Sequence, residues 1–299
     1  MDGTTHHEQA GVERPSLYVV ATPIGNLADI TLRALEVLKR VDTIAAEDTR
    51  VTARLLRHHG IGVPLMALHE HNERRAAQKI LQLLAQGNSV ALVSDAGTPA
   101  ISDPGAMTVA MVREAGYPVV PVPGANAAVG ALSAAGSAAL HFLFYGFLPQ
   151  QAAARRHELA ALKTSPYLLV FYEAPHRVIA TVADMAAAFG AERTITIARE
   201  LTKLFESIHT CKLGAAAAWL AAAANRTKGE FVLLVEGATE AGAADIGAAQ
   251  HALEILLREL SLKQAVKLAA EISGGKRNAL YKLALEMKKN EGRRVKSDE

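Results

Sequence analysis

Short apolar runs alternate with longer amphipathic segments along most of the chain. The runs that we predict as strands are rich in β-branched and aromatic residues and span residues 17–21, 43–46, 90–93, 119–122, 141–147, 168–172, 194–198 and 231–236. Segments with helical spacing end near residues 38 and 59 or span 72–86, 105–115, 152–162, 178–189 and 213–223. Strands that alternate with helices predict a mainly parallel sheet with helices on its faces.

Polar residues mark the expected starts of two helices. Asp29 is predicted to cap the first helix, in which Leu32, Leu35 and Leu38 fall near one face. Asn72 is predicted to cap the helix that runs to residue 86.

The alternation of strands and helices starts again near residues 136–141. We therefore predict a polar lead-in over residues 1–15 and two α/β domains over 16–137 and 138–238. A segment rich in glycine and alanine, 237–247, then links the second domain to a helical domain over 246–290.

Leucine spacing predicts three short helices in this last domain. The expected inward positions are Leu253, Leu256, Leu257 and Leu260, then Leu262, Val266, Ala269 and Ala270, then Leu280, Leu283, Ala284 and Met287. Ser261 is predicted to cap the second helix, and Gly274-Gly275 to form the turn before the third. A basic helix after a glycine turn is typical of a helix-turn-helix that contacts nucleic acid, although a bundle that packs on the body gives the same pattern.

Charge divides the chain in the same place. The 299 residues carry a net charge of +2, but residues 251–299 hold 11 basic and 7 acidic side chains, so the rest of the chain is slightly acidic. A basic tail favours contact with a polyanion, and a solvated terminus is the alternative.

Composition excludes several classes of protein. Half of the residues are hydrophobic, which excludes a disordered chain, and the single cysteine, Cys211, excludes an intrachain disulfide. No apolar run reaches the roughly 20 residues of a membrane span, and residues 1–13 lack the pattern of a signal peptide. We expect a cytoplasmic protein without a membrane segment.

Unusual polar segments follow four of the predicted strands, at 22–27, 46–50, 93–105 and 122–127. Parallel sheets bind ligands at the carboxyl ends of their strands, so these loops are the candidate site. None of them is a Walker loop or a G-x-G-x-x-G turn. The loop at 93–105, with two aspartates, two prolines and two glycines, is the most distinctive.

The motifs TPIGNL, AEDTR, SDAGTPAISDPG, PGANA, FYEAPHR and KGE resemble the ribosomal RNA small-subunit methyltransferase I family, of the tetrapyrrole-methylase superfamily. The resemblance covers about residues 16–290, and the tail is similar to that family's helix-turn-helix extension. It implies two α/β domains of the tetrapyrrole-methylase type, with S-adenosylmethionine between them, plus the small helical domain. It also implies 2′-O-methylation of cytidine 1402 in 16S ribosomal RNA, in the decoding centre of the small ribosomal subunit, and a homodimer.

The resemblance also implies a set of donor-binding residues. They are Pro23, Ile24, Asp95, Thr98, Ile101, Ser102, Asn126, Ala127, Tyr172 and Gly229. Asp95 and Thr98 are expected to bind polar parts of the donor, and Ile101 and Tyr172 to pack on its adenine.

A ribose hydroxyl is a poor nucleophile, so a nearby base should help the transfer. The candidates are Glu47, Glu173 and His69, with Asp48 and Glu70 as further choices; Glu173 could instead pair with Arg177. Basic side chains suited to RNA phosphates are Arg50, Arg177, Lys203, Lys276, Arg277 and Lys282, with Arg74 and Arg199 as further choices. No metal is expected, because His69-Glu70-His71 is too short to form a site by itself.

Two other functions fit parts of the pattern. A methylase of corrinoid precursors would share the fold, but a small macrocycle needs no basic helical tail. A non-catalytic RNA-binding factor would share the tail, but it needs no set of ligand-binding loops at the strand ends.

Overall fold

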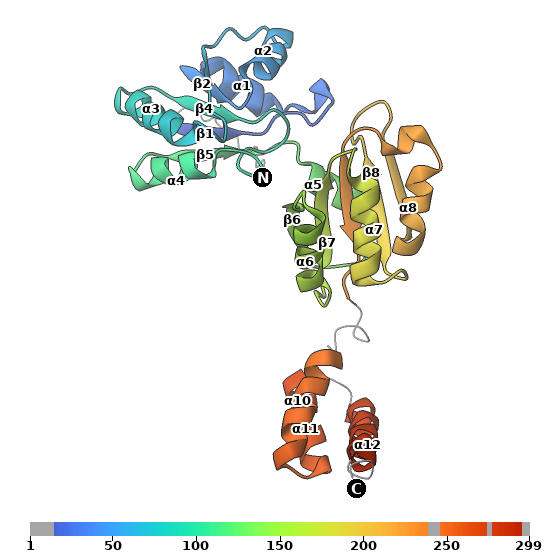
Figure 1. The fold of residues 1–299 in the computed structure, drawn as a ribbon. Coiled ribbons are helices and arrows are strands. Elements are labelled where there is room, and N and C mark those ends of the chain that lie inside the picture. The colour runs from blue at the N-terminus through green and yellow to red at the C-terminus, as the bar shows by residue number, and fades with distance from the viewer. Residues whose placement is uncertain (1–14, 239–245, 274–276, 295–299) are drawn as a thin grey trace, which may run out of the picture.

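The computed structural model describes residues 15–238, 246–273 and 277–294, which form two α/β units followed by three helices (Figure 1). Gly274, Gly275 and Lys276 lie outside the described residues. The two expected α/β domains and the C-terminal helices are therefore present.

The first unit is built on a parallel sheet with strand order β3-β2-β4-β1-β5. Its strands are β1 (Leu17–Val20), β2 (Thr43–Ala46), β3 (Leu65–Ala67), β4 (Val90–Val93) and β5 (Val119–Val122). Helices α1 (Leu32–Arg40) and α2 (Thr49–His58) cover one face, and α3 (Glu73–Ala85) and α4 (Ala106–Glu114) cover the other. Because successive side chains of a strand point to opposite faces, Tyr18 packs under α1 while Leu17 packs under α3.

Local predictions for this unit hold only in part. The cap of α1 is Thr31, whose hydroxyl accepts a hydrogen bond from the Ala34 amide, whereas Asp29 ends a 3-10 turn, η1 (Leu27–Asp29). Leu32 is consequently on the first turn of α1 with 81% of its surface exposed. Asn72 precedes α3, but its side chain accepts from the His69 amide and makes no cap hydrogen bond to the helix.

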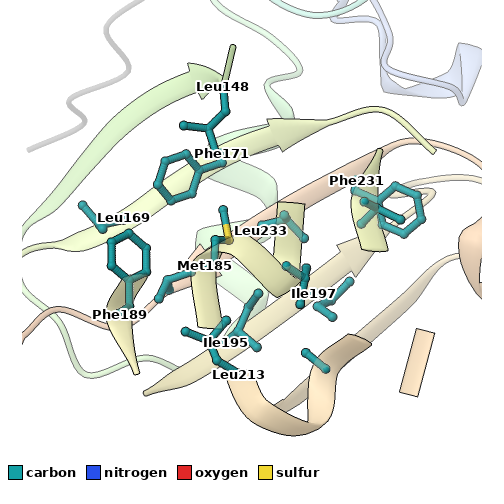
Figure 2. Close-up of a cluster of buried hydrophobic side chains, with 14 of the residues drawn as sticks. Leu148, Leu169, Phe171, Met185, Phe189, Ile195, Ile197, Leu213, Phe231 and Leu233 are labelled. Atoms are coloured by element: carbon teal, nitrogen blue, oxygen red, sulfur yellow. The ribbon is translucent and has the colours of Figure 1, made fainter. Parts of the chain in front are cut away.

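The second unit has a mixed sheet with strand order β6-β7-β10-β8-β9. Its strands are β6 (Phe142–Phe147), β7 (Leu168–Glu173), β8 (Thr194–Arg199), β9 (Ser207–Lys212) and β10 (Phe231–Val235). Helices α6 (Ala152–Leu162), α7 (Val178–Phe189) and α8 (Leu213–Ala221) pack on one face, around the core drawn in Figure 2. Helix α5 (Ala127–Ala134) packs on the other face.

The expectation of a mainly parallel sheet fails in this unit. β6 and β7 are parallel, whereas β10 runs antiparallel to both β7 and β8, and β8 runs antiparallel to β9. Strand β9 is absent from the predicted strands because its sequence, SIHTCK, contains no continuous apolar run. The sequence analysis also placed α5 before the predicted boundary at residues 137/138, although Ala128 and Ala131 are buried against the second sheet.

Helices α10 (Ile246–Glu259), α11 (Leu262–Ser273) and α12 (Arg277–Arg294) follow the second unit, which closes with the 3-10 turn η2 (Ala224–Thr227) and β10. The expected inward residues form their common core, with Leu253, Ala269 and Ala284 fully buried. Ser261 precedes α11, and its hydroxyl donates to the Gln264 side chain at 2.7 Å. Among the described residues, no helix is both long enough and apolar enough to cross a membrane.

Candidate functional site

A cavity of about 350 Å³ is lined by loops of the first unit and strands of the second. The first unit contributes residues after β1, after β4 and at the start of α5. The second contributes the ends of β6 and β7, the loop between β8 and β9, and the start of β10. The site therefore combines loops at the carboxyl ends of parallel strands with the surface of the second sheet.

The loop at 94–105 forms the floor of the cavity and is held in a strained shape. Thr22 and Gly97 exchange two backbone hydrogen bonds of 2.9 and 3.0 Å, which join this loop to the end of β1. Ala100 and Ser102 have φ of 67° and 66°, a region that residues other than glycine seldom adopt. Glu73 anchors the far end of the loop, because its Oε1 accepts from the amides of Gly105 and Thr108 at 3.0 Å each. Strain that is maintained in this way is typical of functional loops.

Carboxylates gather beside this loop at the ends of β2 and β4. The Asp48 amide donates to Asp95 Oδ1 at 2.9 Å, and the Asp95 amide donates to Glu47 Oε2 at 3.3 Å. Burial, followed by the nearby acidic groups, raises the pKa of Glu47, and burial raises the pKa of Asp95. Asp48 caps α2 and pairs with Arg50, whose hydrogen bonds hold the pKa of Asp48 well below its usual range. The AEDTR motif thus has a structural role at the start of α2.

Asp103 lies in the cavity wall at the end of the same loop. Burial, and then the charges of Glu47 and Asp95, raise its pKa to about 6, although a hydrogen bond from Ser94 acts in the opposite direction. No ion pair of the described residues involves Asp103. It is therefore a carboxylate of unusual basicity that faces the ligand space.

Aromatic rings of the second unit form the opposite wall. Tyr172 packs edge-on against Phe144 and Phe147, with ring centroids 5.0 and 5.5 Å apart. Its hydroxyl accepts from the Ala128 amide at 3.2 Å, and burial raises its pKa. Phe147 lines the cavity with 54% of its surface exposed, so one side of the ring is open to a ligand.

The loop between β8 and β9 closes one end of the cavity through Leu201. Lys203 Nζ bridges Glu200 Oε1 at 2.9 Å and Glu230 Oε2 at 2.7 Å, and Glu230 lines the cavity. A side chain at Gly229 would collide with the Glu200 carboxylate, and Gly229 has a φ of 89°. Close packing and backbone shape therefore account for this glycine.

Seven of the ten predicted donor-binding residues line the cavity. They are Ile24, Thr98, Ile101, Ser102, Asn126, Ala127 and Tyr172. Pro23, Asp95 and Gly229 do not line it. Asp95 is held by the Asp48 amide one layer behind the cavity, and Pro23 is buried beside the Thr22–Gly97 bridge. These three residues shape the loops around the cavity.

The three residues predicted as a base lie in different surroundings. Glu173 lines the cavity, but its Oε1 accepts from Ala174 and Arg177 and its Oε2 from Thr181, and its side chain is fully buried. The alternative that Glu173 pairs with Arg177 is thus the observed one. Glu47 lies behind the cavity beside Asp95, and His69 precedes α3 away from the cavity lining. Of the three, Glu173 alone borders the cavity.

The predicted RNA-binding side chains also divide into two groups. Arg177 and Arg199 are held by internal hydrogen bonds, including those to the carbonyls of Leu148, Lys228 and Phe205. Lys203 is held between two carboxylates. Arg50, Arg74, Arg277 and Lys282 have exposed side chains. Lys276 lies outside the described residues.

Sequence reasoning did not select ten of the residues that line the cavity, among them Asp103, Phe147 and Glu230. Asp103, Phe147 and Glu230 all fall in segments that it identified, namely the SDPG half of the loop, the end of a predicted strand and the KGE motif. The Asp-Pro pair in a ligand-binding loop was the available signal for Asp103. In the part of the chain that the structure describes, no three histidine, cysteine or acidic residues are grouped as a metal site.

Comparisons with known proteins identify the family. The profile described as "Tetrapyrrole (Corrin/Porphyrin) Methylases" matches residues 16–217, and that of the "RsmI C-terminal HTH domain" matches 243–288. A protein of Escherichia coli O157:H7 named "Ribosomal RNA small subunit methyltransferase I" is 52% identical over 94% of this chain and 98% of its own. Its namesake in Pseudomonas aeruginosa is 51% identical over 91% and 97%. The chain belongs to the ribosomal RNA small subunit methyltransferase I family. It is accordingly a methyltransferase.

Solved structures support the fold of this family member. A cobalt precorrin-4 methyltransferase aligns with a TM-score of 0.56 and 16% identity over 74% of this chain and 94% of its own. A uroporphyrin-III C-methyltransferase from Thermus thermophilus, complexed with S-adenyl homocysteine, aligns with a TM-score of 0.53 and 16% identity over 73% and 96%. The two α/β units are thus a tetrapyrrole-methylase fold, and the helices beyond residue 243 match the helix-turn-helix domain of the family.

Proposed function

We propose that this methyltransferase transfers the methyl group of S-adenosylmethionine to the ribose 2′-oxygen of cytidine 1402 in 16S ribosomal RNA. The observation that carries the proposal is that one chain contains both the methylase domains and the C-terminal helix-turn-helix domain of the ribosomal RNA methyltransferase family. Relatives of that family are about half identical to this chain over about nine-tenths of its length. A methylase of corrinoid precursors accounts for the body alone.

The cavity suits the methyl donor in size and in chemistry. Its volume of about 350 Å³ falls in the usual range for small-molecule sites. Ile101, Phe147 and Tyr172 offer apolar surface to an adenine. Asn126 caps α5, and the Thr98 hydroxyl donates to the Ala125 carbonyl just before that helix.

When bound, S-adenosylmethionine supplies an activated methyl group on a sulfonium, so the protein needs chiefly to place the acceptor in line and exclude water. The strained loop at 94–105 and the aromatic wall hold the two sides of the cavity at a fixed spacing. Of the residues predicted as a base for the acceptor, Glu173 borders the cavity and Glu47 and His69 do not, and both oxygens of Glu173 already accept hydrogen bonds.

The decisive experiment is transfer of labelled methyl groups to three acceptors in parallel. The acceptors are small ribosomal subunits that lack the modification, their naked RNA, and a tetrapyrrole precursor. We expect label in the ribose of a single cytidine, read by nuclease mapping. Label on the tetrapyrrole alone would favour the corrinoid function, and no label with a bound donor would favour a non-catalytic RNA-binding factor.

The C-terminal helices provide a second test of the RNA substrate. We expect a chain that ends at residue 245 to bind subunits more weakly and with a flatter dependence on salt, because Arg277 and Lys282 are lost from the interface. Donor affinity, measured by calorimetry, should stay the same. An unchanged salt slope would show that the helices only pack on the protein.

The proposal also includes a homodimer that acts in the cytoplasm on the small ribosomal subunit. The superfamily resemblance supports the dimer, and the location follows from the proposed substrate. Light scattering of the full chain measures its mass, and a monomer at all concentrations would contradict the dimer.

A further inference from the structure

We infer that Asp103 accepts the proton of the ribose hydroxyl during methyl transfer, an assignment that rests on the proposed function. Three carboxylates line the cavity, namely Asp103, Glu173 and Glu230. They differ in the hydrogen-bond and ion-pair partners of their carboxylate oxygens, and this difference favours one of them as the base.

Glu173 and Glu230 are both committed to other partners. Glu173 has no exposed side-chain surface, and both of its oxygens accept hydrogen bonds from Ala174, Arg177 and Thr181. Glu230 is paired with Lys203 at 2.7 Å, and 73% of its side chain is exposed. A carboxylate that is neutralised by a cation or saturated with donors is a weak base. Neither residue is suited to take a proton from the acceptor.

Asp103 has the opposite surroundings. Glu47 and Asp95 are near enough for their charges to raise its pKa, and the Tyr172 ring of the second unit is close enough for the Asp103 charge to raise the tyrosine pKa. Acidic neighbours and partial burial make its proton affinity higher than that of an ordinary aspartate, and its pKa of about 6 lies near the working pH. A base of this strength is largely ionised at neutral pH and still accepts a proton effectively.

The loop also fixes where this carboxylate points. Ser102, the preceding residue, has a φ of 66°, and its hydroxyl oxygen lies 2.9 Å from where a side chain at Gly146 of β6 would begin. Two residues later Gly105 is fixed by Glu73. The neighbours of Asp103 are thus held, Ser102 against the second sheet and Gly105 by a side chain of α3, which restricts the backbone that carries this carboxylate.

The step balances with these groups alone. The 2′-oxygen forms a bond to the methyl carbon while the carbon–sulfur bond breaks, and its electron pair stays on the sulfur of the departing thioether. The O–H bond of the ribose hydroxyl breaks, and its proton passes to a carboxylate oxygen of Asp103. Solvent then removes this proton.

The test compares Asp103→Asn with the wild type and with Glu192→Gln, a matched loss of carboxylate charge at an exposed residue before β8. Three quantities are measured: donor affinity by calorimetry, the single-turnover rate on undermethylated small subunits, and the dependence of that rate on pH. We expect Asp103→Asn to lower the rate about 100-fold or more while donor affinity changes less than about threefold. The wild-type rate should rise with pH up to about 6 and then level off, and this rise should be absent in Asp103→Asn. Asp103→Glu should recover part of the rate together with the rise.

Each contrary result has a distinct meaning. A fall in donor affinity that matches the fall in rate would show that Asp103 binds the donor's positive charge and is not the base. A wild-type rate or pH profile in Asp103→Asn would remove it from the chemistry altogether. A wild-type enzyme that binds donor but methylates no RNA would overturn the proposed function, and the assignment of Asp103 with it.

Discussion

The two α/β units contribute different things to one cavity. The first, with its parallel sheet, contributes polar groups on loops, among them Thr98, Asp103 and Asn126. The second, with its mixed sheet, contributes Phe147, Tyr172 and other apolar residues from the strands themselves. Parallel strands end at one edge, so their loops gather there, whereas a mixed sheet offers its flat surface. The first unit thus supplies most of the polar groups of the cavity, and the second supplies most of its apolar surface.

The largest effect that we expect tests whether Glu173 has a structural role and does not act as a base. In Glu173→Gln the half-buried Arg177 loses its counter-ion, and the free energy of unfolding should fall by about 3 kcal/mol. Chemical denaturation measures this, with Glu192→Gln as the exposed control. If Glu173→Gln keeps the wild-type stability but has a lower rate of methyl transfer, Glu173 is again a candidate base.

The next effect concerns the aromatic wall. We expect Tyr172→Ala to weaken donor binding by about tenfold or more, because Tyr172 lines the cavity and supports Phe147 and Phe144. Tyr172→Phe keeps the ring and loses only the hydrogen bond with Ala128, so donor affinity should change less than about threefold. Calorimetry separates the two variants. Equal losses in both would mean that the hydroxyl, and not the ring, matters for binding.

The sequence predicted the parallel half of the molecule better than the mixed half. A buried parallel strand is a continuous apolar run, and the runs at residues 17–21 and 90–93 match β1 and β4. An edge strand such as β9 alternates polar and partly buried positions and carries no such run. The direction of each strand in the second unit depends on the path that the connections between strands take across the sheet. Local sequence patterns do not specify that path.

The site shows a similar division. Motif resemblance located seven residues of the cavity, of which six follow β1, β4 and β5 directly in the sequence and the seventh, Tyr172, lies on β7. Asp95 was preferred over Asp103 although the two are equally distinctive in sequence. The three-dimensional path of the loop distinguishes them: Asp95 accepts a hydrogen bond from the Asp48 amide, whereas Asp103 lines the cavity.

A smaller effect concerns how the ionisation of Asp103 changes the stability of the folded protein. The pKa of Asp103 is raised in the folded protein, so its ionised form opposes folding at pH values above about 6 and has no effect below the pKa of the unfolded chain. Asp103→Asn should therefore raise the melting temperature at pH 7.5 by about 2 °C and leave it unchanged near pH 4. Differential scanning calorimetry at both pH values checks this. A loss of stability at pH 7.5 would indicate a partner that the ionised carboxylate needs.

The smallest effect tests which unit α5 belongs to. Asn126 caps α5 by accepting from the Val129 amide, as Thr31 caps α1, so each change to alanine should cost about 1 kcal/mol. The single tryptophan, Trp219 on α8, packs against the core of the second unit, and its fluorescence reports the unfolding of that unit. Because α5 packs on the second sheet, Asn126→Ala should shift the Trp219 transition at least as much as Thr31→Ala does. If Thr31→Ala shifts that transition more, α5 is stabilised chiefly by the first unit, and the division of the chain lies after residue 137 as the sequence pattern suggests.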